Sequence, residues 1–245
     1  MGLPDHVRGC LFDMDGVLTR TATVHAAAWG EMFNEFLADW GRQTGTSIGL
    51  FTTDDYERYV DGRSRADGTR AVLQSRGINL PDGMPADPPG APTVEGLSNR
   101  KNQILLDVLA TRGVDVFEDA VEYVRAVRAA GIRRAVVSAS ANTAQVLDGA
   151  HITDLFDTRI DGLIAVDKHL AGKPAPDMYL AGAAALNLQP GEAAVFEDAL
   201  AGVEAGRAGG FALVVGVDRI GHGSDLLNHG ADIVVTDLRQ LLALA

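Results

Sequence analysis

Two aspartates placed directly after a short apolar run constrain the fold of this chain more than any other feature. Residues 8–12 predict a buried strand of a parallel sheet, and Asp13, Asp15 and Gly16 follow at once. Because an unpaired buried charge is costly, these carboxylates belong at the carboxyl end of the strand, where open α/β sheets bind ligands. There they can hold a hard cation such as Mg²⁺, and one of them can attack phosphorus. The alternative interpretation is a simple strand-to-turn cap.

Composition and charge argue against several classes of protein. The chain has 245 residues, of which 47% are hydrophobic, enough for one large domain or for a core with an inserted module. Its formal net charge of −12 argues against a nucleic-acid-binding or anionic membrane-binding surface. An anionic substrate remains compatible with this charge, because a bound metal can reverse the local field.

The cysteine content and the first residues bear on cellular location. The single cysteine, Cys10, cannot form an internal disulfide and is expected to be a buried thiol. The first nine residues lack an apolar signal core, and no apolar run reaches the length of a membrane span. We therefore expect a cytoplasmic protein that contacts neither a membrane nor nucleic acid.

The segment after the first strand predicts a helical insertion. From residue 22 to about residue 40 apolar residues recur at helical spacing, and shorter helices are expected at residues 56–60, 70–76 and 102–111. Residues 79–92 are rich in Pro, Gly and Asp and predict a loop. We expect an α/β core formed by residues 1–20 and 116–245, with residues 21–115 inserted as a helical domain.

Strands and helices alternate in the second half of the chain. Asp119 and Glu122 predict a capping box for the first helix, which Gly131 ends. The expected strands are residues 133–138, 161–166, 193–196, 211–217 and 232–235, and the expected helices are residues 142–149, 176–186, 199–209 and 238–244. Alternation of this kind predicts a Rossmann-like parallel sheet with helices on both faces.

A serine-rich segment follows one of these strands. Ser138 ends the strand and begins the sequence Ser-Ala-Ser-Ala-Asn. A hydroxyl and backbone N–H groups at a strand-to-helix turn can bind phosphate oxygens. The alternative is an N-cap formed by Ser140 or Asn142, and the two roles are compatible.

A lysine lies in a stiff loop. Lys173 is followed by Pro174 and Pro176, which restrict the backbone. A positive charge held in this way suits a position beside a phosphoryl group during its transfer. The alternative is an exposed lysine in front of a helix that begins with proline.

A second pair of acids ends another predicted strand. Glu197 and Asp198 follow the apolar residues 193–196 and precede a helix rich in small residues. They can complete a cation site with Asp13 and Asp15. The alternative is that these acids only complement the dipole of the helix that follows. This interpretation accounts for one acidic residue more readily than for two. Four motifs at the same edge of one sheet favour a joint function in phosphoryl transfer.

These motifs, in this order and spacing, resemble the haloacid dehalogenase superfamily over essentially the whole chain. Within it, the chain is most similar to the β-phosphoglucomutase group, through FDMDGVLT, His25 with Ala28-Trp29, GRSR at 62–65, RKN at 100–102, SASAN and GKPAPD. The resemblance implies Mg²⁺-dependent phosphoryl transfer through an aspartyl phosphate, with the helical insertion as a cap domain. It further implies interconversion of β-glucose 1-phosphate and glucose 6-phosphate, so that the expected partner is a small phosphorylated sugar.

The resemblance also implies roles for the motif residues. Asp13 would be the nucleophile and Asp15 the general acid and base, while Ser138 and Lys173 would hold the transferring phosphoryl group. The Mg²⁺ ligands would be Asp13, the backbone carbonyl of Asp15 and Asp198, with Glu197 nearby. The residues expected to recognise substrate are His25, Arg65, Lys101, Ser140 and Asn142.

Three positions depart from the pattern of the group. Ala141 replaces a lysine at the distal phosphate site, Arg20 replaces an acidic hinge residue, and Ala199 replaces a common serine. The loop at residues 79–92 also lengthens the insertion. Two alternatives therefore remain open: a phosphatase acting on a small sugar phosphate, and a catalytically silent binding protein on the same fold. The sequence leaves the sugar, the anomer and the oligomeric state open, and it is compatible with a monomer.

Overall fold

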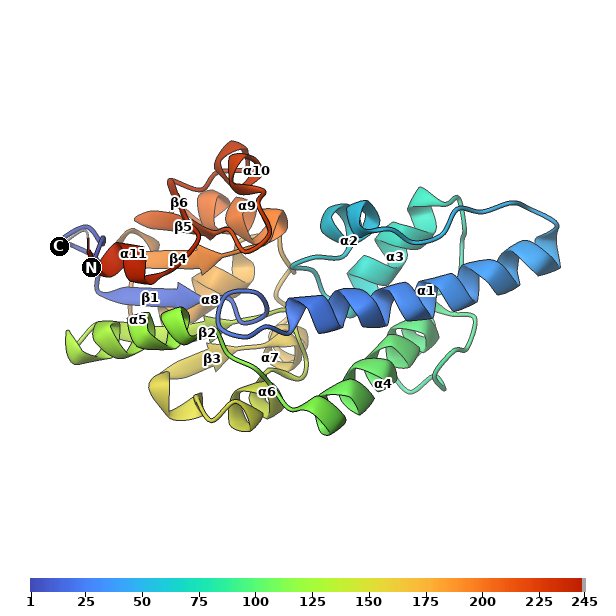
Figure 1. Ribbon diagram of the computed structural model, residues 1–245, viewed down its shortest axis with the longest axis horizontal. Helices are drawn as coiled ribbons and strands as arrows, with labels where there is room; N and C mark the ends of the chain where they lie inside the picture. The colour runs from blue at the N-terminus through green and yellow to red at the C-terminus, as the bar shows by residue number, and fades with distance from the viewer. Residues whose placement is uncertain (244–245) are drawn as a thin grey trace. The chain divides into compact units, whose positions relative to one another are not determined.

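The structure, a computed structural model, describes residues 1–243 and consists of two compact units (Figure 1). The α/β unit contains Met1–Arg20 and Val114–Ala245, and the helical unit contains Thr21–Gly113. The observed second boundary lies two residues before the position expected from the sequence. Among the described residues, no helix combines the length and the apolar character required to cross a bilayer.

A six-stranded parallel sheet forms the centre of the α/β unit. The strands follow the order β3-β2-β1-β4-β5-β6, so the chain first adds strands on one side of β1 and then on the other. Their bounds are β1 Gly9–Phe12, β2 Arg133–Val137, β3 Thr158–Ile160, β4 Ala193–Glu197, β5 Leu213–Val217 and β6 Ile233–Val235. The Rossmann-like α/β fold expected from the sequence is confirmed.

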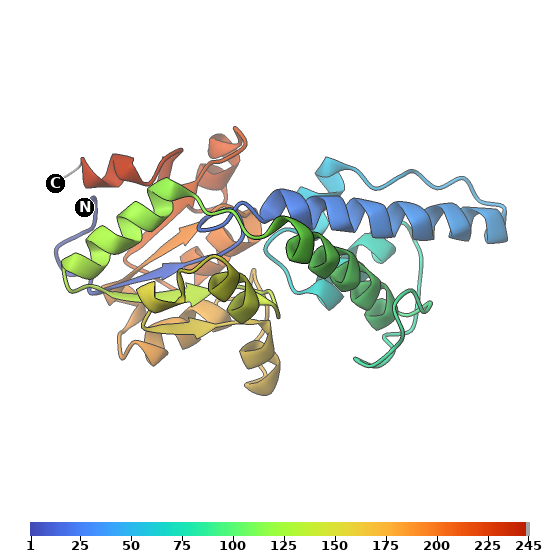
Figure 2. The same ribbon diagram turned by 60° about the horizontal axis from the view of Figure 1, so that its bottom comes forward.

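Helices cover both faces of this sheet. Figure 2 shows the light-green α5 and the red α11 on one side of it. The helices of the unit are α5 Glu118–Ala129, α6 Thr143–Gly149, α7 Gly162–Asp167, α8 Asp177–Ala185, α9 Leu200–Ala208, α10 Gly223–Asn228 and α11 Arg239–Leu242, with 3₁₀ turns at Thr153–Leu155 and Pro190–Glu192. The predicted last helix, residues 238–244, extends past the residues that the structure describes.

Side chains of β1 and β4 alternate between the two faces, as the pleat requires. On one face Phe12 stacks on Phe196 at 4.5 Å and meets the edge of Tyr123 from α5 at 6.3 Å. On the other face Leu11 and Val195 join a core cluster that includes residues of α8 and α9. Both faces of the central strands are therefore buried, which explains their nearly continuous apolar sequence.

The helical unit consists of four helices, three of which begin at a residue whose side chain caps the first turn. Its elements are α1 Ala22–Thr44, α2 Thr53–Tyr59, α3 Arg65–Ser75 and α4 Val94–Arg112. Thr52, Ser64 and Thr93 each accept a hydrogen bond from a backbone N–H in the first turn of the helix that follows. Helix α1 is longer than predicted and ends at Gly45, whose φ of +70° suits glycine. Residues 79–92 form a loop without helix or strand, as expected.

Two local predictions are wrong. Residues 161–166 do not form a strand: Gly162–Asp167 form helix α7, and the Asp161 carboxylate caps it by accepting a hydrogen bond from Ile164 N. The neighbouring strand β3 ends at Ile160. Asp119 does not cap α5 either; it is buried and accepts hydrogen bonds from Arg219 and from Leu238 N.

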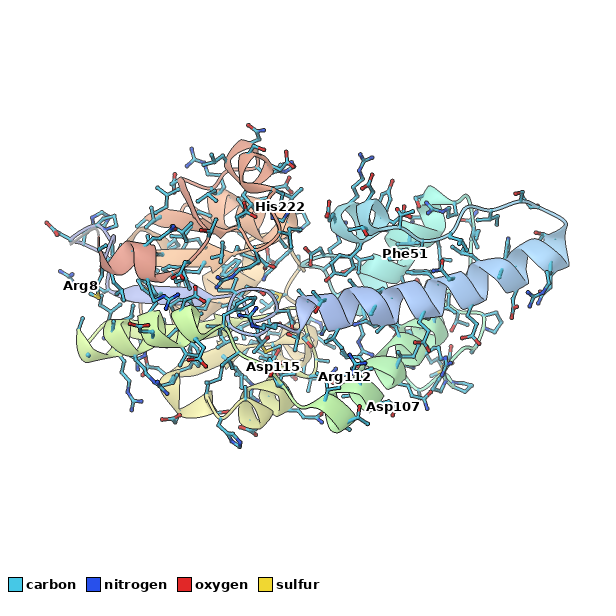
Figure 3. The ribbon with its side chains drawn as sticks, in the orientation of Figure 1. Arg8, Phe51, Asp107, Arg112, Asp115 and His222 are labelled. Carbon is cyan, nitrogen blue, oxygen red and sulfur yellow. The ribbon has the colours of Figure 1, made fainter. Side chains whose placement is uncertain are left out.

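The two chain segments that leave the α/β unit run side by side. Thr19 and Val116 form an antiparallel bridge, and Arg20 N donates to Asp115 O at 2.8 Å; Asp115 is labelled in Figure 3. Phe117 lies between two guanidinium groups, with Arg20 at 4.3 Å and Arg219 at 4.0 Å from its ring centroid. These contacts anchor both segments to the α/β unit.

Candidate active site

The register of the sheet brings the acidic motifs together. Phe12 pairs with Val136 of β2 and with Phe196 of β4, so the next residue of each strand lies at the same edge. Asp13 N donates to Phe196 O at 2.9 Å, which extends the pairing into the motif. Asp13 and Glu197 are therefore carried by neighbouring strands at their carboxyl ends, as the sequence predicted.

Lys173 connects these two carboxylates. Its Nζ lies 2.6 Å from Asp13 Oδ1 and 2.5 Å from Glu197 Oε1, and it also donates to Val137 O at 3.2 Å. The side chain of Lys173 is 0% exposed, so these contacts are shielded from water. The alternative of an exposed lysine does not hold.

Glu197 accepts hydrogen bonds from three directions. Besides Lys173, Oε1 accepts from the Tyr179 hydroxyl at 2.9 Å, and Oε2 accepts from Ala199 N at 3.0 Å. The carboxylate also packs against Gly202, where an added Cβ would lie 1.7 Å from Oε1. Glu197 is fully buried and held in one position, from which it orients the Lys173 ammonium.

Burial and charge both act on the pKa values of this cluster. Burial raises the pKa of the Asp13 carboxyl well above its usual value, Lys173 opposes this rise, and Glu197 and Asp15 add to it. Burial acts to lower the pKa of Lys173, but Asp13 and Glu197 outweigh it and raise that pKa. Glu197 and Asp15 thus disfavour the ionised form of Asp13, and a cation bound beside these carboxylates would offset their mutual repulsion.

Asp198 completes a possible cation site. Oxygen atoms of Asp13, Glu197 and Asp198 all lie within 4.8 Å of one another. The Asp198 carboxylate packs against Gly16, which has a φ of +91° and where an added Cβ would lie 1.7 Å from Oδ2. Carboxylate oxygens in this number and spacing fit a hard divalent cation. Glu197 Oε1 already accepts hydrogen bonds from Lys173 and Tyr179.

Asp15 lies in the turn that follows β1. It is half-buried, and its backbone forms a bridge with Thr19. Its negative charge contributes to the raised pKa of Asp13, so the two carboxylates are electrostatically close.

The serine-rich turn lies at the end of β2. Ser138 is buried, and its hydroxyl accepts a hydrogen bond from Ser140 N at 3.1 Å. The Ser140 hydroxyl accepts in turn from Asn142 N at 3.1 Å. Asn142 is the N-cap residue of α6 but makes no side-chain capping bond to it. The hydroxyls therefore order the turn itself, and Ser138 directly follows Val137, whose carbonyl binds Lys173.

The remaining predicted residues belong to the helical unit. Lys101 of α4 is fully buried, and its Nζ lies 3.1 Å from His25 Nδ1 and 5.1 Å from the Trp29 ring centroid. Arg65 begins α3 and donates to Ser98 O at 3.3 Å, one helical turn before Lys101. Burial lowers the pKa of Arg65, and Glu95 opposes this. The structure thus brings His25 and Lys101 into contact, and it places Arg65 of α3 against α4, the helix that carries Lys101.

Two residues of the site were not anticipated from the sequence. Tyr179 has the spacing of an ordinary core aromatic on α8, yet its hydroxyl reaches Glu197. His222 lies in a loop before α10, and its Nε2 is 3.1 Å from Asp198 O. Neither residue carries a local motif. The only sequence signal near either of them is the GKPAPD segment at residues 172–177, which ends two residues before Tyr179.

A comparison with known families agrees with this geometry. The family model of haloacid dehalogenase-like hydrolases matches residues 7–210. The chain belongs to this family. The matched region includes all four motifs at the sheet edge as well as the helical unit.

Individual relatives within the family carry a more specific name. A β-phosphoglucomutase of Mycobacterium bovis is 51% identical over 246 residues, covering 99% of this chain and 94% of the relative. A β-phosphoglucomutase of Bacillus subtilis is 28% identical over 238 residues, with coverages of 96% and 92%. The crystal structure of β-phosphoglucomutase from Clostridium difficile superposes with a TM-score of 0.74 at 25% identity and covers 96% of this chain and 93% of its own.

Proposed function

We propose that this chain is a Mg²⁺-dependent β-phosphoglucomutase that interconverts β-glucose 1-phosphate and glucose 6-phosphate through an aspartyl phosphate. The observation that carries the proposal is the buried Asp13–Lys173–Glu197 arrangement at the carboxyl ends of β1 and β4. A relative named β-phosphoglucomutase, 51% identical over nearly the whole chain, supports the choice of substrate.

The acidic cluster fits Mg²⁺ as the cofactor. Asp13, Asp198 and the backbone carbonyl of Asp15 would hold the ion, with Glu197 adjacent to them. When bound, Mg²⁺ would neutralise negative charge on the phosphoryl oxygens. The feature of this structure that favours such a cation is the convergence of three carboxylates within 4.8 Å of one another.

Asp13 would act as the nucleophile in each transfer. An oxygen of its carboxylate forms a bond to phosphorus while the bond from phosphorus to the sugar oxygen breaks, and the electron pair of that bond stays on the sugar oxygen. Lys173 offsets negative charge at Asp13 and at the phosphoryl group. Ser138, at the end of the neighbouring strand, would donate its hydroxyl to a phosphoryl oxygen.

Asp15 would move the proton that each transfer requires. As the phosphoryl group leaves a sugar, Asp15 gives a proton to the sugar oxygen. In the reverse direction it removes the proton from the hydroxyl that attacks the aspartyl phosphate. Phosphorylated Asp13 would first convert β-glucose 1-phosphate to a bisphosphate, which would reorient and return the other phosphoryl group to Asp13, releasing glucose 6-phosphate.

The distal end of the substrate would be recognised by basic and polar side chains. Arg65 suits a non-transferring phosphate, because a guanidinium binds phosphate oxygens in pairs. Lys101 and His25, which contact each other, would meet the sugar. In the α/β unit, Ser140 and Asn142 would contact a phosphate of the substrate, where Ala141 leaves one positive charge fewer than the β-phosphoglucomutase group normally has.

A phosphatase is the second candidate function. The matching family model is described as a hydrolase, and the missing lysine at position 141 weakens the site for a second phosphate. A phosphatase would form the same aspartyl phosphate and pass it to water. The two functions therefore differ in whether a sugar hydroxyl or water reaches the phosphoenzyme.

Phosphorus NMR separates these functions. The enzyme is mixed with Mg²⁺, β-glucose 1-phosphate and a trace of glucose 1,6-bisphosphate, and the phosphorus signals are followed with time. Accumulation of glucose 6-phosphate supports the mutase, whereas inorganic phosphate as the main product supports the phosphatase.

The variant Asp13→Asn serves as the control and should give neither product, because an amide is a poor nucleophile. A loss of more than about 4 kcal/mol of transition-state stabilisation corresponds to removal of the covalent step. Substantial turnover by Asp13→Asn would contradict the assignment of the nucleophile. No conversion by the unchanged enzyme would favour a different substrate or a catalytically silent protein.

A further inference from the structure

A tight loop joins β5 to α10 and is closed by one carboxylate. Asp218 Oδ1 accepts hydrogen bonds from the backbone N–H groups of Ile220 at 3.1 Å, Gly221 at 2.6 Å and His222 at 3.1 Å. Asp218 Oδ2 accepts from Gly223 N at 3.0 Å. Four bonds to one side chain leave the backbone of this loop little freedom.

Arg219 anchors the same loop to another part of the α/β unit. Its Nη1 donates to Asp119 Oδ2 and to Thr236 O, each at 3.0 Å. Its guanidinium also lies over the Phe117 ring at 4.0 Å. The ion pair is largely buried, with side-chain exposures of 13% for Arg219 and 8% for Asp119. The loop is therefore held in place as well as in shape.

His222 extends from this loop to the acidic motif after β4. Figure 3 labels it beside α10, and its Nε2 lies 3.1 Å from the backbone oxygen of Asp198. A carbonyl oxygen can only accept a hydrogen bond, so Nε2 carries the hydrogen and donates it. The donor belongs to a residue 24 positions away from Asp198 in the chain.

The contact with His222 is one of two hydrogen bonds that fix the peptide group between Asp198 and Ala199. The Asp198–Ala199 peptide presents its C=O to His222, and its N–H donates to Glu197 Oε2 at 3.0 Å. The peptide plane is thus bonded on both sides. Because this peptide group is bonded to the Asp198 Cα, holding it in place restricts the backbone position from which the Asp198 side chain extends.

The Asp198 carboxylate has little room for adjustment. Oδ2 packs directly against Gly16, and the ligand atoms of Asp13, Glu197 and Asp198 converge within 4.8 Å. A small shift of the Asp198 backbone would change these distances. Side chains that orient metal ligands typically affect metal affinity about 10- to 100-fold when they are replaced.

We propose that His222 is a positioning residue that holds Asp198 in the orientation required to bind a divalent cation. This inference rests on the proposed function, in which Asp198 is a Mg²⁺ ligand. His222 acts through the Asp198–Ala199 peptide and does not itself contact the substrate or the cation.

The test measures Mg²⁺ affinity by isothermal titration calorimetry and thermal stability without Mg²⁺. His222→Phe keeps the bulk of the ring but removes the donor, His222→Ala removes both, and His222→Gln supplies an amide donor at a similar reach. The matched control is His229→Phe, which replaces another histidine of this region, at the end of α10, whose Nδ1 lies 2.6 Å from Glu204.

We expect His222→Phe and His222→Ala to weaken Mg²⁺ binding about 10- to 100-fold, with His222→Gln and His229→Phe near the affinity of the unchanged chain. Equal Mg²⁺ affinity in all variants would overturn the proposal, even if thermal stability falls. Weak binding by His222→Gln as well as by His222→Phe would also overturn it, because the donor would not be what matters.

If the proposed function itself were wrong, the Mg²⁺ titrations would give a different pattern. In that case the unchanged chain would not bind Mg²⁺, or Asp198→Asn would bind it as tightly as the unchanged chain does. Failure of the inference alone would leave Mg²⁺ binding dependent on Asp198 and independent of His222.

Discussion

Replacing Lys173 with methionine removes the ammonium group that lies between two buried carboxylates. In the native structure Nζ is 2.6 Å from Asp13 Oδ1 and 2.5 Å from Glu197 Oε1, and the side chain is 0% exposed. Methionine keeps most of the length and volume of lysine and fills irregular space well. The loss of charge should therefore outweigh any effect of an added cavity.

The size of the effect follows from this burial. Breaking a buried ion pair by removing one partner typically costs about 3–5 kcal/mol, because the remaining charge is left uncompensated. Asp13 can limit the loss by taking up a proton, since burial already raises its pKa. We expect Lys173→Met to lower the free energy of unfolding by about 3 kcal/mol at neutral pH. The loss should shrink as the pH falls, because a protonated Asp13 no longer needs a counter-charge.

The assay is urea denaturation of single and double variants. Glu197→Gln removes one of the two carboxylates that Lys173 neutralises, so the double variant should lose less stability than the sum of the single variants. The expected coupling is about 1–3 kcal/mol, as for other residues in direct contact. Lys168→Met replaces an exposed lysine of the same unit and serves as the control.

Two results would refute this reasoning. One is a loss of stability for Lys173→Met no greater than that for Lys168→Met. The other is simple additivity of Lys173→Met and Glu197→Gln, which would mean that the two groups do not interact energetically. Either result would require a different account of why a lysine is fully buried at this sheet edge.

Three further predictions concern other contacts. Tyr179→Phe removes one hydrogen bond to Glu197 and should lower the free energy of unfolding by about 1 kcal/mol. It should also lower kcat by a larger factor than it changes KM, and unchanged kinetics would show that Tyr179 is only structural. Burial opposes ionisation of Asp55, but hydrogen bonds from Arg76 and the capping box lower its pKa. Asp55→Asn should therefore lower the free energy of unfolding by about 1 kcal/mol above pH 4. That difference should close as the pH falls through the lowered pKa, and a constant difference in denaturation from pH 7 to pH 2 would contradict it. Arg65→Ala should slow turnover of phosphorylated sugars far more than that of acetyl phosphate, and equal slowing of both would argue against a distal phosphate site at Arg65.

The acidic motifs show what could be predicted from sequence. Asp13 and Glu197 were expected at strand ends because a charged residue directly after an apolar run has few other places in an α/β sheet. Their pairing across β1 and β4 follows from parallel register, and the structure confirms that both lie at one edge. The short apolar segment at residues 161–166 was misassigned because its periodicity does not distinguish a strand from a helix, and the Asp161 cap decided it.

The local sequence determined which chemical groups stand at the ends of the strands, and the tertiary structure decided which of these groups contact one another. The order of strands and helices and the placement of acids after strands are short-range properties, which propensity and burial dictate within a few residues. The contacts of Lys173, Tyr179 and His222 with the acids join segments that are 18 to 160 residues apart in the chain. Such contacts depend on how β4, α8 and the loop after β5 pack, and packing is a property of the whole sheet rather than of any one segment.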